Sequence, residues 1–439
     1  MLRRVRAEEV SSARGRAVDE RTLEQAAEIV RRVEREGAAA VRMFAEQFGE
    51  RRADEPLVLG RASMESALAR LDVEDRACLQ RTARRIERFA RAQKQALHEL
   101  DIAIEGGRAG HTLECVASAG CYVPAGRSPL PSTALMTAVT ARVAGCERVV
   151  VATPGAHPVI LAACAIAGVD EVLAVGGAHS VAALAFGFTG FEACDVIAGP
   201  GNRWVTAAKQ IVSGVVGIDM LAGPSELLII ADDTADASIV AADLIAQAEH
   251  DTDARAMLVT TSEALARGVC EQLERQLALI STRRTAAAAL GNGFVCVVES
   301  MDQAVTVADR VAAEHLEVMT REPQAVARQV RSAGAVFIGG SSAEVLGDYG
   351  AGPNHTLPTG GTARFRAGLS VAHFLRLRTW LRIDDLSAAE PLVADAERLA
   401  RMEGLFGHER SAAARRIPQA GEGGRRSCTP DRESPKASP

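Results

Sequence analysis

Hydrophobic residues recur along this chain with two different spacings, and the change from one to the other predicts its main parts. Up to about residue 100 the apolar positions are spaced as on helices, which predicts two long amphipathic helices at 24–48 and 64–100. Residues 1–20 are polar and offer little core material, so we expect an N-terminal arm. The pair Gly106-Gly107 predicts a turn beyond the second helix.

Short apolar runs alternate with helical patterns from about residue 114 to residue 340. The run at 148–153 is continuous and β-branched, which is typical of a strand buried in a parallel sheet. Further strands are expected at 171–175, 195–198, 227–231, 256–260, 294–298, 316–319 and 335–338. Because helical patterns separate these runs, the sequence predicts a doubly wound α/β architecture in two domains.

The order of these patterns also predicts the domain boundaries. We expect the N-terminal helices to complete the second alternating set, so that 21–117 and 231–369 form the first domain and 118–230 form the second. Residues 370–416 are predicted to be a separate helical segment. The tail at 417–439 has little apolar content among its Gly, Arg, Ser and Pro residues, which predicts disorder.

Composition and charge narrow the class of protein. The 439 residues suit two or three domains, and 48% hydrophobic with 24% charged residues is ordinary for a soluble globular protein. A net charge of −6 argues against a nucleic-acid partner, which usually requires a basic excess. The arginine-rich run at 81–91 is better interpreted as the solvated face of an amphipathic helix.

Cysteine usage and the N-terminal sequence indicate the compartment. Nine scattered cysteines without a C-x-x-C pair suggest neither a disulfide framework nor a zinc finger. The first residues, Met1-Leu-Arg-Arg, lead into acidic residues, unlike a signal peptide. No apolar run is long enough to cross a bilayer, so we predict a cytoplasmic protein without a membrane partner.

One helix end carries two side chains suited to a metal. Gln247 and His250 are three residues apart, so on a helix they share a face, and their amide oxygen and imidazole nitrogen can point the same way. The alternative is an ordinary helix C-terminus, where a histidine complements the helix dipole. A metal needs three or four ligands, so other stretches have to supply the remainder.

Four further stretches hold candidate chemistry. Glu314 and His315 lie at a helix-to-strand junction; active sites collect at the carboxyl edge of parallel sheets, although a surface pair is the simpler alternative. A loop of small residues frames Asp348 and His355, and its glycines permit close approach to a ligand. The other two stretches are a turn and a helix end, either of which can be purely structural, and they carry Ser225, Glu403 and His408.

Together these stretches resemble the histidinol dehydrogenase family over about residues 20–415. The matching stretches are Tyr122-Val-Pro-Ala-Gly, Val175-Gly-Gly-Ala, Gly199-Pro-Gly-Asn-Arg-Trp-Val-Thr-Ala-Ala-Lys, Asp219-Met-Leu-Ala-Gly-Pro-Ser-Glu, Gln247-Ala-Glu-His, Glu314-His-Leu, and Gly347-Asp-Tyr through Asn354-His-Thr-Leu-Pro. One such stretch would be weak, but the ordered set is specific.

The resemblance implies a role for each candidate residue. One zinc ion per subunit would be held by Gln247, His250, Asp348 and His408, with the last ligand from the partner subunit of a homodimer whose active sites are composite. His315 would be the general base and Glu314 would activate water. Further contacts to the substrate would come from Ser225, His355 and Glu403, together with His315 and the four zinc ligands. Tyr122, His179 and Asn202 would contact NAD, with His179 where the family often has Gln.

The resemblance also implies the fold and the reaction. It implies two incomplete Rossmann-like domains and a C-terminal dimerisation segment, whose helix near 376–385 is less like the family. The reaction would be zinc-dependent oxidation of L-histidinol to L-histidine through an aldehyde, with two NAD molecules. No full G-x-G-x-x-G follows the first strand, so the dinucleotide site must be built differently.

Three alternatives stay open. The chain could be a relative in the same family that oxidises another amino or sulfonated alcohol. It could also be a non-catalytic paralogue or a nucleotide-binding regulatory protein. The filled ligand and catalytic positions count against the last two, because neither role requires them.

Overall fold

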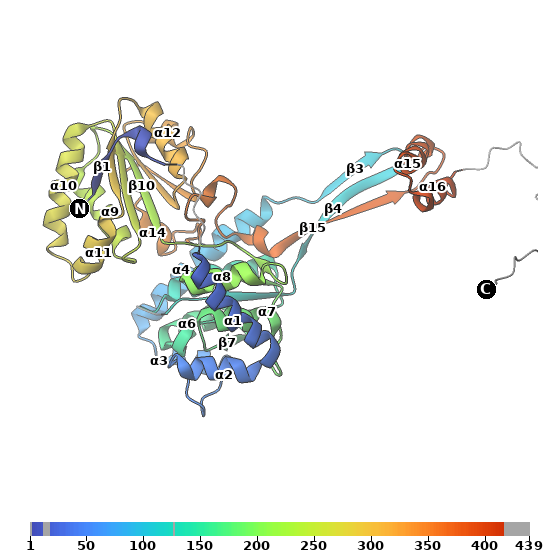
Figure 1. Ribbon diagram of the computed structural model, residues 1–439, viewed down its shortest axis with the longest axis horizontal. Helices are drawn as coiled ribbons and strands as arrows, with labels where there is room; N and C mark the ends of the chain where they lie inside the picture. Colours follow the sequence, from blue (N-terminus) through green and yellow to red (C-terminus); the bar gives the residue numbers. More distant parts are fainter. Residues whose placement is uncertain (1, 12–17, 126–127, 417–439) are drawn as a thin grey trace, which may run out of the picture. The chain divides into compact units, whose positions relative to one another are not determined.

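The computed structural model describes residues 2–11, 18–125 and 128–416, and they form two compact units. The first unit comprises the described parts of 1–97 and 115–376, and the second those of 98–114 and 377–416. The first contains two sheets flanked by helices, which confirms the predicted α/β architecture (Figure 1). The predicted disordered tail at 417–439 lies outside the described residues.

Four helices, where two were predicted, occupy the N-terminal region. They are α1 (Glu20–Glu36), α2 (Ala38–Gln47), α3 (Arg61–Arg70) and α4 (Val73–Gln95). Gly37, with a φ of 55°, separates the first two helices, because that left-handed region is one that glycine adopts readily. Asp72 begins α4 by accepting hydrogen bonds from the N–H groups of Glu74 and Asp75.

One six-stranded sheet, here called sheet B, has the strand order β2-β7-β6-β5-β8-β9. Its strands are β2 (Val58–Leu59), β5 (Ser118–Tyr122), β6 (Arg148–Ala152), β7 (Glu171–Leu173), β8 (Val196–Ala198) and β9 (Gly217–Ile218), parallel except for β2 against β7. Its helices are α5 (Pro131–Ala144), α6 (Pro158–Ala167), α7 (Gly177–Phe186) and α8 (Arg203–Val212). Alternate residues of β6 enter two cores, Val151 on one face and Val150 on the other, so both faces are buried.

The N-terminal helices pack on sheet B, so the predicted domain division is wrong. Helix α1 contacts α7 and α8, while α3 contacts α6 and α4 contacts α5. Ile86 shares a core with Val151, and Val30 shares one with Val150. The helical spacing showed that each helix buries a face, but it carries no information on which sheet receives that face.

Sheet A is entirely parallel, with the order β1-β12-β11-β10-β13-β14. Its strands are β1 (Arg3–Val5), β10 (Glu226–Ala231), β11 (Arg255–Thr260), β12 (Phe294–Val297), β13 (His315–Met319) and β14 (Ala335–Ile338). Its helices are α9 (Ala237–Ala248), α10 (Glu263–Leu277), α11 (Arg283–Leu290), α12 (Met301–Val311), α13 (Pro323–Ala327) and α14 (Glu344–Asp348). Helices α9 to α11 cover one face and α12 covers the other (Figure 1).

Two sequence-based boundaries around sheet A are corrected. The predicted N-terminal arm contains β1, which pairs with β12, and it buries Val5 and Val10. The predicted boundary at residue 230 falls inside β10, which starts at Glu226. A three-residue strand is too short to show a periodic pattern, which is why the arm was misinterpreted.

Both sheets share one strand order. Counting the strands of each parallel set along the chain, the spatial order is third, second, first, fourth, fifth in β7-β6-β5-β8-β9 and again in β12-β11-β10-β13-β14. This is the order of one half of a Rossmann fold, in which the winding reverses between the first and fourth strands. The two reversal points therefore lie between β5 and β8 and between β10 and β13.

The second unit holds a three-stranded sheet and two helices. Its elements are β3 (Leu100–Ile104), β4 (Gly107–Cys115), β15 (Leu375–Ile383), α15 (Glu390–Met402) and α16 (Phe406–Ala413). The turn predicted at Gly106-Gly107 joins β3 and β4, and is confirmed. The helix predicted at 376–385 is wrong, because that segment is β15. Its leucines at 375, 377 and 381 are spaced by even numbers, which is the period of a strand.

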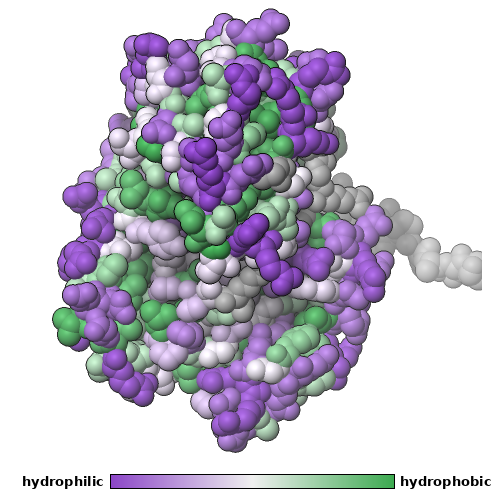
Figure 2. Space-filling view, turned by 90° about the vertical axis from the view of Figure 1, so that its left-hand side faces the viewer, coloured by the Kyte–Doolittle hydropathy of each residue, from purple (hydrophilic) through white to green (hydrophobic). Residues whose placement is uncertain are grey.

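Short 3-10 helices lie at Ala7–Glu9, Pro154–Ala156, Thr362–Arg364 and Val371–Phe374. Among the described residues, no helix is both long and apolar enough to span a bilayer. On the face that Figure 2 shows, hydrophilic residues dominate the rim and hydrophobic residues lie in scattered groups.

Candidate active site

The predicted catalytic pair lies at the amino ends of the strands of sheet A. His315 is the first residue of β13, and it pairs with Leu227 of β10, so the pair sits at the reversal point of this sheet. The expectation of a carboxyl-edge position is wrong for these residues, because a helix-to-strand junction necessarily lies where the following strand begins. In sheet B the predicted NAD contacts do lie at the carboxyl edge, since Tyr122 ends β5 and Asn202 follows β8.

A cavity of about 590 Å³ brings most of the predicted site residues together. Its walls come from both α/β parts of the first unit. The predicted residues that line it are Asn202, Ser225, His250, Glu314, His315, Asp348 and His355.

Three ligand-type side chains converge at one end of this site. His250, Glu344 and Asp348 each offer a ligand atom within 4.8 Å of the others, and His250 Nε2 lies 3.5 Å from Asp348 Oδ2. Gln247 is fully buried in the last turn of α9. With its amide nitrogen turned toward Glu344, it donates to both carboxylate oxygens, at 2.9 and 3.2 Å. Three of the four predicted zinc ligands thus lie around one point.

Glu344 is a site residue that the sequence analysis missed. It is 2% exposed, and burial followed by the charge of Asp348 raises the pKa of its carboxyl well above the usual value. The available signal was its spacing of four residues from Asp348, which places both on one face of α14.

The donor set fits a divalent cation. No lysine or arginine in the described part of the chain forms an ion pair with Glu344 or Asp348, so imidazoles are the basic groups that face these two carboxyl groups. Imidazole nitrogen with carboxylate and amide oxygen is a set that zinc accepts. The hydrogen bond that His250 donates to the Asp348 carboxylate raises the pKa of His250, which identifies that carboxylate as its strongest partner.

The catalytic pair is almost completely buried. Glu314 Oε2 accepts a hydrogen bond of 2.9 Å from the Glu226 N–H, and His315 Nδ1 lies 3.3 Å from the Glu226 carbonyl oxygen. His315 Nε2 faces Asp348 Oδ1 at 3.7 Å. Burial lowers the pKa of His315 to about 4 and raises that of Glu314 well above its usual value, so both groups favour the neutral form.

The predicted substrate contacts divide between the two units. Ser225 hydrogen-bonds to Glu314, and His355 is held by Thr133 Oγ1 at 3.1 Å and by the Asp348 carbonyl oxygen at 3.0 Å. Glu403 and His408 belong to the second unit, where Glu403 ends α15 and His408 lies in α16, both exposed.

Among the predicted NAD contacts, only Asn202 lines the cavity. Its side-chain oxygen caps α8 by accepting from Trp204 N and Val205 N at 3.0 and 3.2 Å. Tyr122 is buried, its hydroxyl oxygen accepts a hydrogen bond from the Gly177 N–H, and burial raises its pKa to about 12.

His179 is committed to a partner that the sequence analysis did not consider. Its Nε2 lies 2.9 Å from Glu50 Oε2, and the same oxygen accepts the Gly176 N–H at 3.0 Å. The imidazole packs beside Phe44 and Phe48 and is 1% exposed. The Glu50 carboxylate therefore links the His179 ring to the Gly176 N–H, and His179 does not line the cavity.

Comparisons with known proteins agree on one family. The family model described as histidinol dehydrogenase matches residues 12–416. A histidinol dehydrogenase from Cereibacter sphaeroides is 44% identical over 367 residues, which is 82% of this chain and 84% of the relative. One from Nitratidesulfovibrio vulgaris is 45% identical over 366 residues, 80% of this chain and 83% of the relative.

A solved structure extends the comparison to three dimensions. The crystal structure of histidinol dehydrogenase from Elizabethkingia anophelis matches with a TM-score of 0.86 at 32% sequence identity, covering 92% of this chain and 94% of that one.

Proposed function

Since the chain belongs to the histidinol dehydrogenase family, we propose that it oxidises L-histidinol through the aldehyde to L-histidine, in the last steps of histidine biosynthesis. One observation carries this proposal. A buried Glu314–His315 pair faces the His250–Glu344–Asp348 group across a single cavity. A general base beside a cation-binding group suits the oxidation of an alcohol that carries nitrogen ligands.

The first oxidation requires a base with a free lone pair. His315 is neutral at ordinary pH, and the Glu226 carbonyl oxygen beside Nδ1 favours the tautomer with the proton there. Nε2 then has the lone pair on the side of Asp348. We propose that Nε2 takes the proton of the substrate hydroxyl group. The hydride leaves the carbon that bears this hydroxyl group and is transferred to the nicotinamide ring.

The second oxidation requires water. Glu314 is buried and hydrogen-bonded to the Glu226 N–H and to Ser225, so its carboxyl group is fixed in direction. We propose that its carboxylate form, which the raised pKa makes a stronger base, takes a proton from the water that attacks the aldehyde carbon. His315 then takes the hydroxyl proton of the hydrate as the second hydride leaves, so that both oxidations use one base.

The metal and the dinucleotide are assigned to separate groups of residues. We propose that Gln247, His250, Asp348 and His408 hold zinc, which when bound would orient the amino alcohol and polarise its oxygen. Asn202 can donate its amide N–H to NAD, because only its oxygen is used in capping α8. Tyr122 and His179 would support the Gly176-Gly177 turn, which lies along the same edge of sheet B as Asn202.

We propose a homodimer with composite sites, in which Glu403 and His408 serve the partner's cavity. In support, the second unit exposes large apolar side chains near these two residues in sequence. They are Leu399, Met402, Leu405 and Phe406. Such side chains usually mark an interaction surface. The cytoplasmic location stays a prediction.

The test is the yield of NADH from L-histidinol by the purified protein. Two NADH per histidinol are expected, and a chelator followed by gel filtration should abolish activity that added Zn²⁺ restores. Parallel assays with other amino alcohols and with a sulfonated alcohol test the same-family alternative. No NADH from L-histidinol, with a good yield from one of these, would replace the proposed substrate.

A further inference from the structure

Glu226 touches both catalytic residues through its main chain. As the first residue of β10 it lies beside the start of β13. Its N–H donates to Glu314 Oε2 at 2.9 Å, and its carbonyl oxygen lies 3.3 Å from His315 Nδ1. One residue therefore sets the direction of the Glu314 carboxyl group and the tautomer of the His315 ring.

The side chain of Glu226 is anchored on the opposite side. Oε1 accepts a hydrogen bond of 2.9 Å from Arg255 Nη1, and Oε2 accepts one of 3.1 Å from the Gly360 N–H. Glu226 is only 3% exposed, and Arg255 forms the one ion pair that the described residues provide for it. Without the guanidinium, a buried carboxylate would keep only neutral backbone donors, those of Gly360 and Glu314, which is an unfavourable arrangement.

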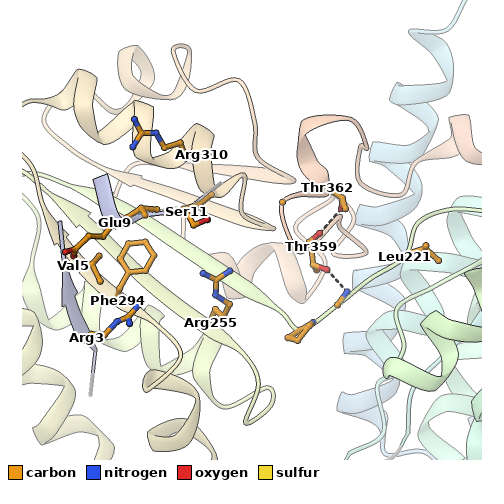
Figure 3. Close-up of a pocket in the computed structure, with 16 residues that line it drawn as sticks. Arg3, Val5, Glu9, Ser11, Leu221, Arg255, Phe294, Arg310, Thr359 and Thr362 are labelled. Carbon is orange, nitrogen blue, oxygen red and sulfur yellow. Dashed lines mark hydrogen bonds between the residues drawn. The ribbon is translucent and has the colours of Figure 1, made fainter. Parts of the chain in front are cut away.

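Arg255 reaches Glu226 from a second cavity, here called the arginine cavity. It measures about 340 Å³, and its lining includes Arg3, Arg255, Arg310 and Thr359. Figure 3 shows the Arg255 side chain between the Arg3–Phe294 side and the Thr359–Thr362 side. The wall toward the active-site cavity is shared, because Thr359 lines both cavities and accepts a hydrogen bond from the Gly223 N–H.

We propose that Arg255 and Glu226 are a positioning pair for the proton transfers of Glu314 and His315, an inference that rests on the proposed function. The pair touches no reacting atom. It fixes the β10 peptide groups that hold the two catalytic side chains, and small misplacements of such side chains slow chemistry strongly. Because Glu226 contacts both residues, loss of the pair should slow both oxidations.

The experiment compares three variants with wild type. Arg255→Met removes the charge and keeps an unbranched apolar side chain, whereas Arg255→Lys keeps the charge without the planar fork. Arg3→Met is the matched control, because Arg3 is an exposed arginine that lines the same cavity. The ion pair of Glu226 is with Arg255, so this control leaves that pair intact. Single-turnover rate constants are measured with enzyme in excess, from histidinol and from histidinal, because these constants do not depend on the folded fraction.

Arg255→Met should lower both rate constants roughly 10- to 100-fold while the Michaelis constants of substrate and NAD change little. Arg255→Lys should recover part of the loss, and it also serves if the methionine variant does not fold. Arg3→Met should behave as wild type. Wild-type rate constants in both Arg255 variants, or a rise in Michaelis constants alone, would overturn the positioning role. Absence of NADH from the wild type would instead overturn the proposed function.

Discussion

Two adjacent residues, Glu314 and His315, are driven toward the same neutral state by one physical cause. Burial raises the pKa of the carboxyl group and lowers that of the imidazole, because each charged form loses its hydration. They differ in what they face. Glu314 faces Ser225 and the Glu226 N–H, while His315 Nε2 faces Asp348. Different surroundings allow the two groups to serve different proton transfers.

The first prediction separates these roles. His315→Asn should lower turnover on both histidinol and histidinal by roughly two to four orders of magnitude, the usual contribution of a general base. Glu314→Gln should slow conversion of histidinal more than that of histidinol, because only the aldehyde step needs an activated water. Stopped-flow traces of NADH from each substrate check this. Equal losses on both substrates in Glu314→Gln would contradict the assignment.

Behind the site lies a pair of buried acids, Asp243 and Glu317. The two carboxyl groups lie close together, and burial raises the pKa of both, helped in Glu317 by the charge of Asp243. Between the ordinary and the raised values the folded protein binds protons more tightly than the unfolded chain. The pair's contribution to stability is therefore present at low pH and is lost as pH rises through the raised values.

The second prediction follows from that sign. In the Glu317→Gln variant the new side chain cannot ionise. Its amide oxygen can still accept from the Glu344 N–H, which bonds to Glu317 Oε1 in the wild type, and its amide nitrogen can donate to Asp243. The difference in melting temperature between this variant and the wild type should be more positive at pH 8 than at pH 5. The change should be on the order of 2–4 °C for each kcal/mol of charge-burial cost that the substitution removes. Thermal unfolding at fixed zinc and protein concentration measures it. Exposed Glu271→Gln on α10 is the control and should show no such difference.

At the scale of elements, the loop between β8 and α8 joins a structural role to a proposed binding role in one side chain. The Asn202 oxygen caps the helix, which leaves the amide N–H groups for a ligand. The helix N-terminus adds a favourable field for the phosphates of a dinucleotide. Substitutions that keep or remove the cap can therefore separate the two roles.

The third prediction uses that separation. Asn202→Asp keeps a capping oxygen and loses the amide donor, so it should raise the Michaelis constant for NAD, leave that for histidinol nearly unchanged and preserve the melting temperature. Asn202→Ala should raise the same constant and also cost about 1 kcal/mol of helix capping. Steady-state kinetics and thermal unfolding are compared. An unchanged Michaelis constant for NAD in both variants would remove Asn202 from the dinucleotide site.

The elements were predictable where the spacing of residues had one interpretation. The β-branched run of β6 has one interpretation, a strand buried on both faces. In β15 the arginines between the leucines obscure the even spacing of those leucines, and a helix was predicted there instead. His250 and Asp348 lie together with Glu344, and Gln247 donates to Glu344, while their role as zinc ligands stays a prediction. Glu344 and the Glu50 partner of His179 were missed, since contacts between distant segments leave no local pattern.

At the scale of the whole molecule, the predicted site residues belong to two units. The described residues supply the cavity from the first unit, while Glu403 and His408 lie in the second, beside exposed apolar side chains. A symmetric dimer would contain two identical composite sites, each drawing on both chains.

The fourth prediction is complementation between two inactive variants. Mixed His250→Ala and His408→Ala subunits should recover activity, because one site of each heterodimer carries both lesions and the other carries neither. Random exchange should restore roughly a quarter of wild-type activity. Subunit exchange is followed by mass-tagged chains. Lasting inactivity despite confirmed exchange would mean that each site is built from one chain.

The pairing of β1 with β12 has a consequence for how the chain folds on the ribosome. Strand β1 is made first, yet β12, the strand with which it pairs in sheet A, begins at Phe294, so β1 waits until most of the chain has been synthesised. Every strand of sheet B is complete by Ile218 and can assemble earlier. Pairing across so long a loop is slow. The active-site cavity, which needs walls from both sheets, is therefore among the last features of the nascent chain to form.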